Sequence, residues 1–93
     1  MKVFKSQIID QLAYKSNITK KDSRELIDNL LELITDHLKK DNKVEFKNFG
    51  SFDLTHLPEM IGRNPKSQQP VKVPARKRIR FTAGEGLRKD VNS

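Results

Sequence analysis

The chain has 93 residues, a length that suits one small domain with a modest core. It contains no cysteine, which excludes disulfides and thiolate metal sites and fits a reducing compartment. The sequence shows no apolar run near the ~18 residues of a membrane span, and its first residues lack the apolar core of a signal peptide. These features predict an intracellular, cytoplasmic protein with no membrane partner.

The formal net charge of +7 is concentrated in one segment of the chain. No Asp or Glu occurs between Met60 and Gly84, and that window holds seven bases: Arg63, Lys66, Lys72, Arg76, Lys77, Arg78 and Arg80. The other twelve bases are balanced by twelve acids. A long block of one sign attracts a polyanion, although a solvated basic strand that serves solubility is the simpler alternative.

Apolar spacing predicts two helices in the first half. The apolar residues of segment 4–16 recur at helical intervals, and Asn17 and Ile18 end that pattern. Thr19 can then cap a second helix, with Asp22 three residues further on. The apolar stripe of this second helix is an ordinary core face, but it is wide enough to indicate a second chain as well. Its members are Leu26, Ile27, Leu30, Leu31, Leu33, Ile34 and Leu38.

Alternation of apolar and polar residues predicts strands in the second half. Segments 43–47 and 51–54 alternate on either side of a turn. The stretch Ile61–Pro70 contains one Gly, two Pro and little apolar content, so it predicts a long exposed loop.

The residues after this loop alternate again, and the last of them form a basic strand. With a period of two, Ile79 and Phe81 can face the core while a row of bases points away from it. That row contains Arg76, Arg78 and Arg80. Gly84 then lets the chain turn into a short final helix.

This order of elements carries recognisable motifs. The sequence "NFGSF", then "GRNP", then a basic strand ending "RF", then "AGEGLRKDV", resembles the HU/IHF family of bacterial histone-like DNA-binding proteins over nearly the whole chain. The resemblance implies an α+β fold with two N-terminal helices, a three-stranded antiparallel sheet with a long protruding β-arm, and a short C-terminal helix. It also implies an intertwined dimer.

The same resemblance implies a single DNA-binding domain, residues 1–93, whose segments have different roles. Residues 1–41 form the helical dimerisation part, 42–83 the sheet, and 84–93 the C-terminal helix. The DNA-binding arm covers about 55–75.

The implied activity is to bend and compact double-stranded DNA in the nucleoid. In this family the arms enter the minor groove and a proline at the tip wedges between base pairs, so Pro65 takes that place, although a plain turn proline is the alternative. Arg63 and Asn64 lie beside it. The remaining implied DNA contacts are Lys66, Lys72, Arg76, Arg78, Arg80, Lys5 and Arg88.

The chain departs from the family pattern at several places. The outgoing arm strand has no Lys or Arg before Arg63, and it holds Pro58, which interrupts pairing, and Glu59. The tip lacks the Gly that commonly follows "NP". Glu85 stands where Lys is frequent. On the helices, Lys5 and Asp28 match a pair that, in some relatives, exchanges its ion pair for a DNA contact.

Two branches of the family and one other class stay open. HU-like members are mostly homodimers or close heterodimers with little sequence preference, and we favour that branch with a homodimer. An IHF-like subunit of a heterodimer with a paralogous chain is the alternative. An RNA-binding protein is the rival from another class. The phenylalanines take inward phases and offer no stacking platform, so RNA is expected only as a secondary ligand.

An enzyme is not expected. His37 and His56 have no nucleophile or metal-ligand cluster near them in the sequence. We expect no cofactor and no metal.

Overall fold

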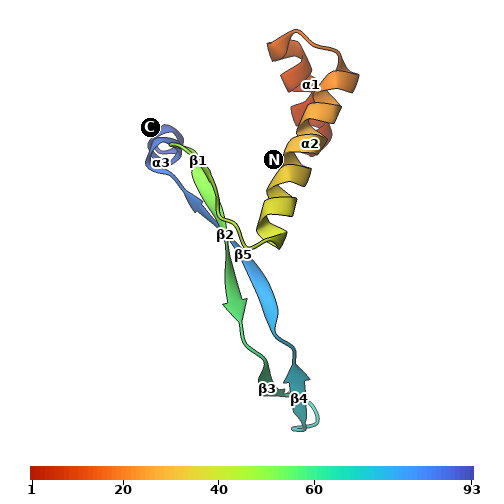
Figure 1. Ribbon diagram of the computed structural model, residues 1–93, viewed down its shortest axis with the longest axis vertical. Coiled ribbons are helices and arrows are strands. Elements are labelled where there is room, and N and C mark those ends of the chain that lie inside the picture. Colours follow the sequence, from red (N-terminus) through yellow and green to blue (C-terminus); the bar gives the residue numbers. More distant parts are fainter. The chain divides into compact units, whose positions relative to one another are not determined.

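The computed structural model describes all residues, Met1–Ser93. It divides into two compact units, residues 1–36 and 37–93, which are described separately. Figure 1 shows its elements in chain order. They are α1 (Lys5–Ser16), α2 (Lys20–Lys39), β1 (Val44–Phe46), β2 (Gly50–Leu57), β3 (Met60–Arg63), β4 (Pro70–Val73), β5 (Arg76–Ala83) and α3 (Glu85–Val91). The predicted α+β fold is confirmed.

The ends of the first two helices form as their sequences predict. Asn17 ends α1 in the left-handed conformation, with φ 55°. The Oγ1 of Thr19 accepts a hydrogen bond from the backbone N–H of Asp22 at 3.1 Å, which confirms Thr19 as the cap of α2. At the start of α1, the side chain of Gln7 accepts the N–H of Phe4 at 2.7 Å. These bonds satisfy donors that a bare helix end leaves unpaired.

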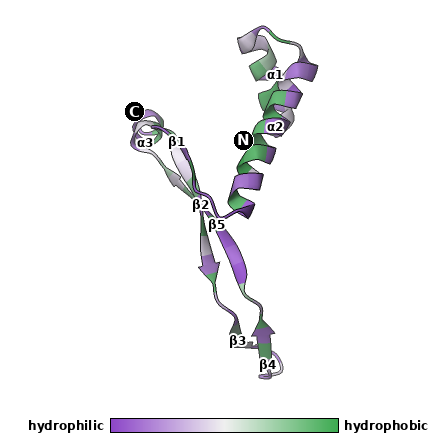
Figure 2. Ribbon diagram, viewed as in Figure 1, coloured by the Kyte–Doolittle hydropathy of each residue, from purple (hydrophilic) through white to green (hydrophobic).

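The apolar stripe of α2 is wider than its helical partner can cover. On a helical wheel its apolar side chains span about 160°, against ~100° for an ordinary core face. Figure 2 shows this apolar surface along α2. Four of its leucines are about half exposed in the single chain: Leu26 (57%), Leu30 (46%), Leu31 (47%) and Leu33 (57%).

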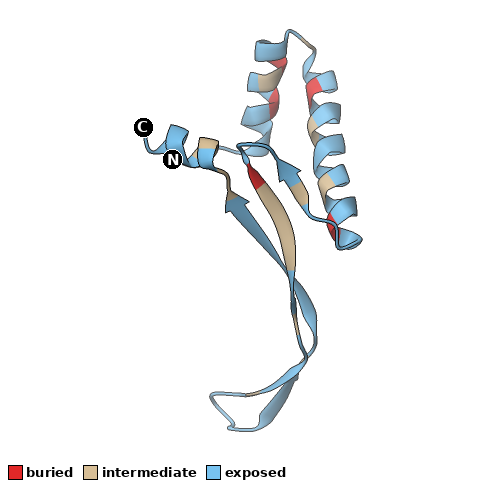
Figure 3. Ribbon diagram, turned by 60° about the vertical axis from the view of Figure 1, so that its left-hand side comes forward, coloured by how far each residue is buried: buried red, intermediate tan, exposed pale blue.

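The buried core of one chain is correspondingly small. Figure 3 shows buried positions where α1 and α2 lie side by side, and few elsewhere. Ile9 and Ala13 of α1 are buried, as is Ser23 of α2, whose hydroxyl donates to the carbonyl oxygen of Ile9 at 2.7 Å.

The sheet is three-stranded and antiparallel, in the order β1-β2-β5, as predicted. Phe52 pairs with Phe81 across β2 and β5, with ring centroids 4.9 Å apart. Phe81 is nevertheless 43% exposed, and Ile79 is 66% exposed. The expectation that these two residues sit on a core is therefore wrong within one chain, because neither side chain is buried there.

The arm continues from the sheet as a second ladder. The pair Leu57 and Arg76 ends the β2–β5 ladder, and pairing resumes at Met60 and Val73. The residues between them include Pro58, which has no N–H to donate, so its predicted interruption is confirmed.

The predicted loop Ile61–Pro70 is wrong at both ends. Ile61, Gly62 and Arg63 lie in β3, and Pro70 begins β4, so only residues 64–69 form a loop. The physical reason is the antiparallel partner strand, which supplies the backbone hydrogen bonds that the local sequence cannot report.

The C-terminal helix is held by the turn between β1 and β2. The N–H of Leu87 donates to the carbonyl oxygen of Asn48 at 2.9 Å. The N–H of Gly84 donates to the carbonyl oxygen of Phe49, also at 2.9 Å. A Cβ on Gly84 would lie 3.0 Å from the backbone of Asn48, so a larger residue would push this turn away from α3 by a few tenths of an ångström.

Candidate nucleic-acid interface

The three arginines of β5 share one face of the sheet, as the sequence predicts. Opposite them on β2 stand Leu57 for Arg76, Thr55 for Arg78 and Asp53 for Arg80. The other face carries the pairs Phe52–Phe81 and Leu54–Ile79. We call the row Arg76, Arg78 and Arg80 the basic row. It is exposed along its length, and Figure 2 shows this stretch of β5 as strongly hydrophilic.

Arg80 is held by an acid. Its Nε lies 3.3 Å from Oδ1 of Asp53 and its Nη2 lies 3.2 Å from Oδ2. The hydrogen bonds from Arg80 lower the pKa of Asp53 below its ordinary value. Sequence reasoning missed this pair, because the two residues are 27 positions apart and the β2–β5 register that pairs them spans the whole arm.

Arg76 and Arg78 make no ion pair in this structure. Their partners across β2 are an apolar residue and a hydroxyl, which leaves both guanidinium groups available to a ligand. A phosphate diester could accept bidentate hydrogen bonds from either of them.

Lys77 lies on the opposite face and does not belong to the basic row. Its Nζ is 3.2 Å from Oδ1 of Asp41 and 3.5 Å from the carbonyl oxygen of Lys39, at the end of α2. His56, its partner across the ladder, also contacts Asp41, at 3.2 Å. Asp41 therefore ties the base of the arm to the turn that follows Lys39.

The tip of the arm is a turn built around Asn64. Its N–H donates to the carbonyl oxygen of Gln69 at 3.0 Å, and its Oδ1 accepts the N–H of Lys66 at 2.9 Å. Gln68 takes the left-handed conformation, φ 61°, in a tip that lacks the family's usual glycine. Pro65 is exposed within this turn, next to the cationic side chain of Arg63 at the end of β3.

Lys72 on the returning arm strand is also paired with an acid. Its Nζ lies 3.3 Å from Oε1 of Glu59, at the break between β2 and β3. Both side chains are more than half exposed, so water screens this pair strongly.

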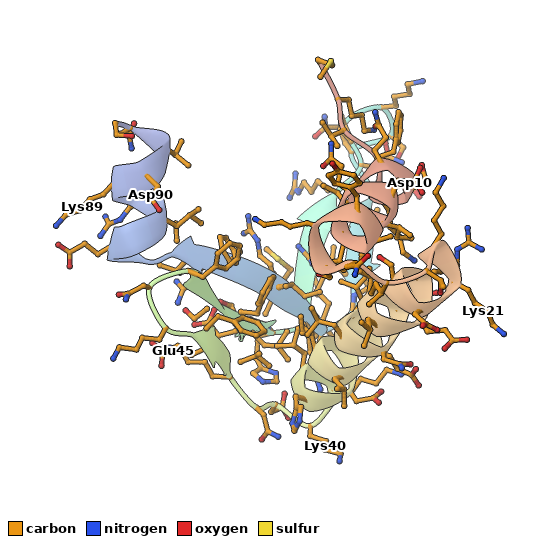
Figure 4. All side chains as sticks on the ribbon, turned by 90° about the horizontal axis from the view of Figure 1, so that it is seen from above. Asp10, Lys21, Lys40, Glu45, Lys89 and Asp90 are labelled. Carbon is orange, nitrogen blue, oxygen red and sulfur yellow. The ribbon has the colours of Figure 1, made fainter.

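The remaining predicted contacts lie in different units. On the helices, Lys5 forms an ion pair with Asp28, as its match to the family pattern suggests. On α3, Arg88 is exposed and makes no ion pair, while Glu85 pairs with Lys89 at 3.0 Å. Figure 4 shows Lys89 projecting outward from α3.

Other kinds of site find little support. No group of three or more His, Asp or Glu side chains is arranged to hold a metal ion. No helix is both long enough and apolar enough to span a membrane. Nδ1 of His37 lies 3.1 Å from Nδ2 of Asn42.

Comparisons with known proteins point in one direction. The family model described as "Bacterial DNA-binding protein" matches residues 3–92. The chain is 37% identical to DNA-binding protein HU of Thermotoga maritima over 87 residues, 94% of this chain and 97% of that protein. It is 38% identical to integration host factor subunit beta of Halorhodospira halophila over 90 residues, 96% of this chain and 88% of that protein.

The fold comparison agrees. A co-crystal structure of Anabaena HU with DNA matches with a TM-score of 0.85 and 31% identity, covering 96% of this chain and 97% of that one.

Proposed function

The chain belongs to the HU/IHF family of non-enzymatic bacterial DNA-binding proteins, and from that premise we propose that it bends and compacts double-stranded DNA in the nucleoid with little sequence preference. The observation that carries this proposal is the basic row, in which two exposed arginines have no acid partner. Their spacing along one face of β5 suits the phosphates of a duplex, and no base-reading group accompanies them.

The arm supplies the bending step in this proposal. Pro65 stands exposed at the tip, where its apolar ring without an N–H can enter a base stack without an unsatisfied donor. Arg63 and Asn64 flank it toward the minor groove, and Lys66 adds charge. Unstacking costs a few kcal/mol per step, which contacts along the bent duplex offset.

Phosphate contacts extend from the arm over both units. Arg76 and Arg78 make them directly. Lys72 and Lys5 contribute once their ion pairs open, and Arg88 contributes from α3. The contribution of Arg80 depends on its pair with Asp53.

A second copy of the chain completes the fold in this proposal. The single chain leaves two apolar surfaces exposed, the leucine stripe of α2 and the face of β5 that carries Ile79 and Phe81. A homodimer in which these surfaces meet is the simplest way to bury them.

An IHF-like subunit is the second candidate. Its support is the near-equal identity of the chain to an HU protein and to an integration host factor beta subunit. In that case a paralogous chain, rather than a second copy, covers the leucine stripe. In either case RNA stays open as a secondary ligand, because phosphate contacts do not distinguish it from DNA.

Equilibrium titration of the purified chain tests the proposal. The ligands are a random-sequence duplex, the same duplex with a nick, and a single-stranded RNA, each over a salt series. Tight, steeply salt-dependent binding that is stronger on the nicked duplex supports a self-sufficient HU-like protein. Weak binding of every DNA by the lone chain contradicts it and favours the heterodimer, and a preference for RNA favours the other class.

A further inference from the structure

Asp53 forms a bidentate ion pair with Arg80, which is also the geometry in which arginine binds a phosphate. Arg80 Nε and Nη2 approach the two carboxylate oxygens separately, at 3.3 and 3.2 Å, so the Nε/Nη2 edge of the guanidinium is occupied. Arginine binds carboxylate and phosphate oxygens through such bidentate edges. A DNA phosphate that approaches Arg80 therefore competes with a carboxylate for this edge and is repelled by its charge at the others.

This pair differs from the other ion pairs of the acid-free window. The side chain of Asp53 is 24% exposed, whereas Glu59, which holds Lys72, is 53% exposed. Only the Asp53–Arg80 pair is bidentate, and the two residues are direct neighbours across β2 and β5. It is consequently the pair that water and salt open least readily.

The pair also makes the basic row uneven. Arg76 and Arg78 have no acid partner, while Arg80, nearest to α3 along β5, is neutralised. The free positive charge of the row is therefore confined to its arm-ward end.

Resting on the proposed function, we propose that Asp53 sets the affinity of this face for DNA by competing with phosphate for Arg80. In the free protein the row presents two arginines to DNA rather than three. DNA gains the third only by displacing the Asp53 carboxylate.

The test compares Asp53→Asn with Glu45→Gln. Glu45 of β1 pairs with Ser51, which places it on the same face as Asp53, and it makes no ion pair; Figure 4 labels it on its strand. Each substitution removes one negative charge, but only the first frees Arg80. We expect D53N to steepen the plot of log Kobs against log salt by about 0.9 per chain, and E45Q to leave that slope unchanged.

Two further variants keep the test informative if D53N folds poorly. In the wild-type background, R78Q should lower the slope by about 0.9 per chain, and R80Q should leave it nearly unchanged. In the D53N background, R80Q should remove the gain in slope. Thermal melts followed by circular dichroism establish that each variant is folded.

The outcomes separate this inference from the function on which it rests. A wild-type chain that binds no DNA contradicts the proposed function. If the wild type binds and R80Q lowers the slope as much as R78Q does, Arg80 already contacts phosphate while paired, and the role of Asp53 is overturned. Equal slopes for D53N and E45Q overturn it as well.

Discussion

The hydroxyl of Ser23 in α2 donates a hydrogen bond to the carbonyl oxygen of Ile9 in α1 at 2.7 Å, and Ser23 has no exposed surface. This bond ties the two helices together at the centre of a very small core. Ser23→Ala should lower the free energy of unfolding by about 1 kcal/mol, because one buried hydrogen bond is lost. Urea denaturation at a fixed chain concentration measures the change.

The matched control for this prediction is Ser6→Ala, an exposed serine on α1. Its substitution should change the unfolding free energy by less than about 0.5 kcal/mol. Equal effects at the two positions would show that the Ser23 hydroxyl adds nothing specific to the packing of α1 against α2.

Gly50 begins β2 where the sheet is most closely packed. A Cβ at this position would lie 2.5 Å from Cζ of Phe81 and 2.7 Å from the backbone oxygen of Thr82. Gly50→Ala should therefore destabilise the fold by roughly 1–3 kcal/mol through overpacking. Thermal or urea unfolding measures the loss.

Gly62→Ala on the arm provides the matched comparison. A Cβ there would lie 3.9 Å from Val73, at ordinary contact distance. Replacing glycine without strain restricts the unfolded chain, so G62A should be neutral or more stable by about 0.4–1 kcal/mol. A G50A protein as stable as G62A would mean that the sheet can relax around the added methyl group.

Asp53 should also give the fold a dependence on acid. Hydrogen bonds from Arg80 hold its pKa below the ordinary 3.8, so the unfolded chain takes up this proton more readily than the folded one. Above pH 3.8, the ordinary pKa, the pair contributes its full stabilisation to the fold. This stabilisation is lost as the pH falls through the lowered pKa of Asp53 in the folded protein. The difference in unfolding free energy between wild type and Asp53→Asn should shrink as the pH is taken from neutral into that acid range.

Arg80→Gln is the control for this titration because it removes the cause of the lowered pKa. In the R80Q background, Asp53→Asn should no longer change how the unfolding free energy falls at acid pH. If R80Q loses stability at acid pH as the wild type does, the pH dependence comes from other carboxylates.

Substitution of Leu33 tests whether a second copy of the chain covers the leucine stripe of α2. It is 57% exposed in the single chain, so in a monomer Leu33→Ala should cost less than about 0.5 kcal/mol. If a partner chain buries Leu33, the expected loss of unfolding free energy rises to about 2–5 kcal/mol for each substituted leucine. Ile61→Ala, at a 75% exposed position on the arm, should be close to neutral. Sedimentation gives the mass, and urea unfolding at two concentrations gives the stability.

Much of this fold is readable from local sequence. The Thr19 cap, the wide stripe of α2 and the side of β5 that carries the arginines all follow from periods of 3.6 and 2. These features depend on neighbours within a few residues. A single sequence therefore predicts them without any knowledge of the third dimension.

What the sequence left out depends on pairing between distant residues. Composition alone placed residues 61–63 of β3 in a loop, although the family resemblance implied a β-arm, because the hydrogen-bond partners of these residues lie in β4. The acids that neutralise Arg80 and Lys72 come from Asp53 and Glu59, outside the acid-free window. A charge count along the chain treats every base in that window as free, whereas the register pairs two of the predicted contacts with carboxylates.

Pro65 carries the last prediction, which concerns bending rather than attachment. Replacing its ring with a methyl group removes the wedge while leaving Arg63 and Lys66 in place. Pro65→Ala should therefore reduce the preference for nicked over intact duplex about tenfold or abolish it, because a complex without the wedge no longer unstacks a base step, and the few kcal/mol that a nick saves there no longer matter. The salt slope should stay as in the wild type, because no phosphate contact is lost.

Pro70→Ala is the control, since this proline begins β4 beside the tip but lies outside the turn. It should keep the nick preference. Fluorescence energy transfer between the ends of a labelled duplex reports bending independently of affinity, and the end-to-end distance should lengthen in complexes with P65A alone. A P65A protein that still bends DNA and still prefers the nick would make Pro65 a plain turn residue and move the source of bending to the phosphate contacts of Arg76 and Arg78.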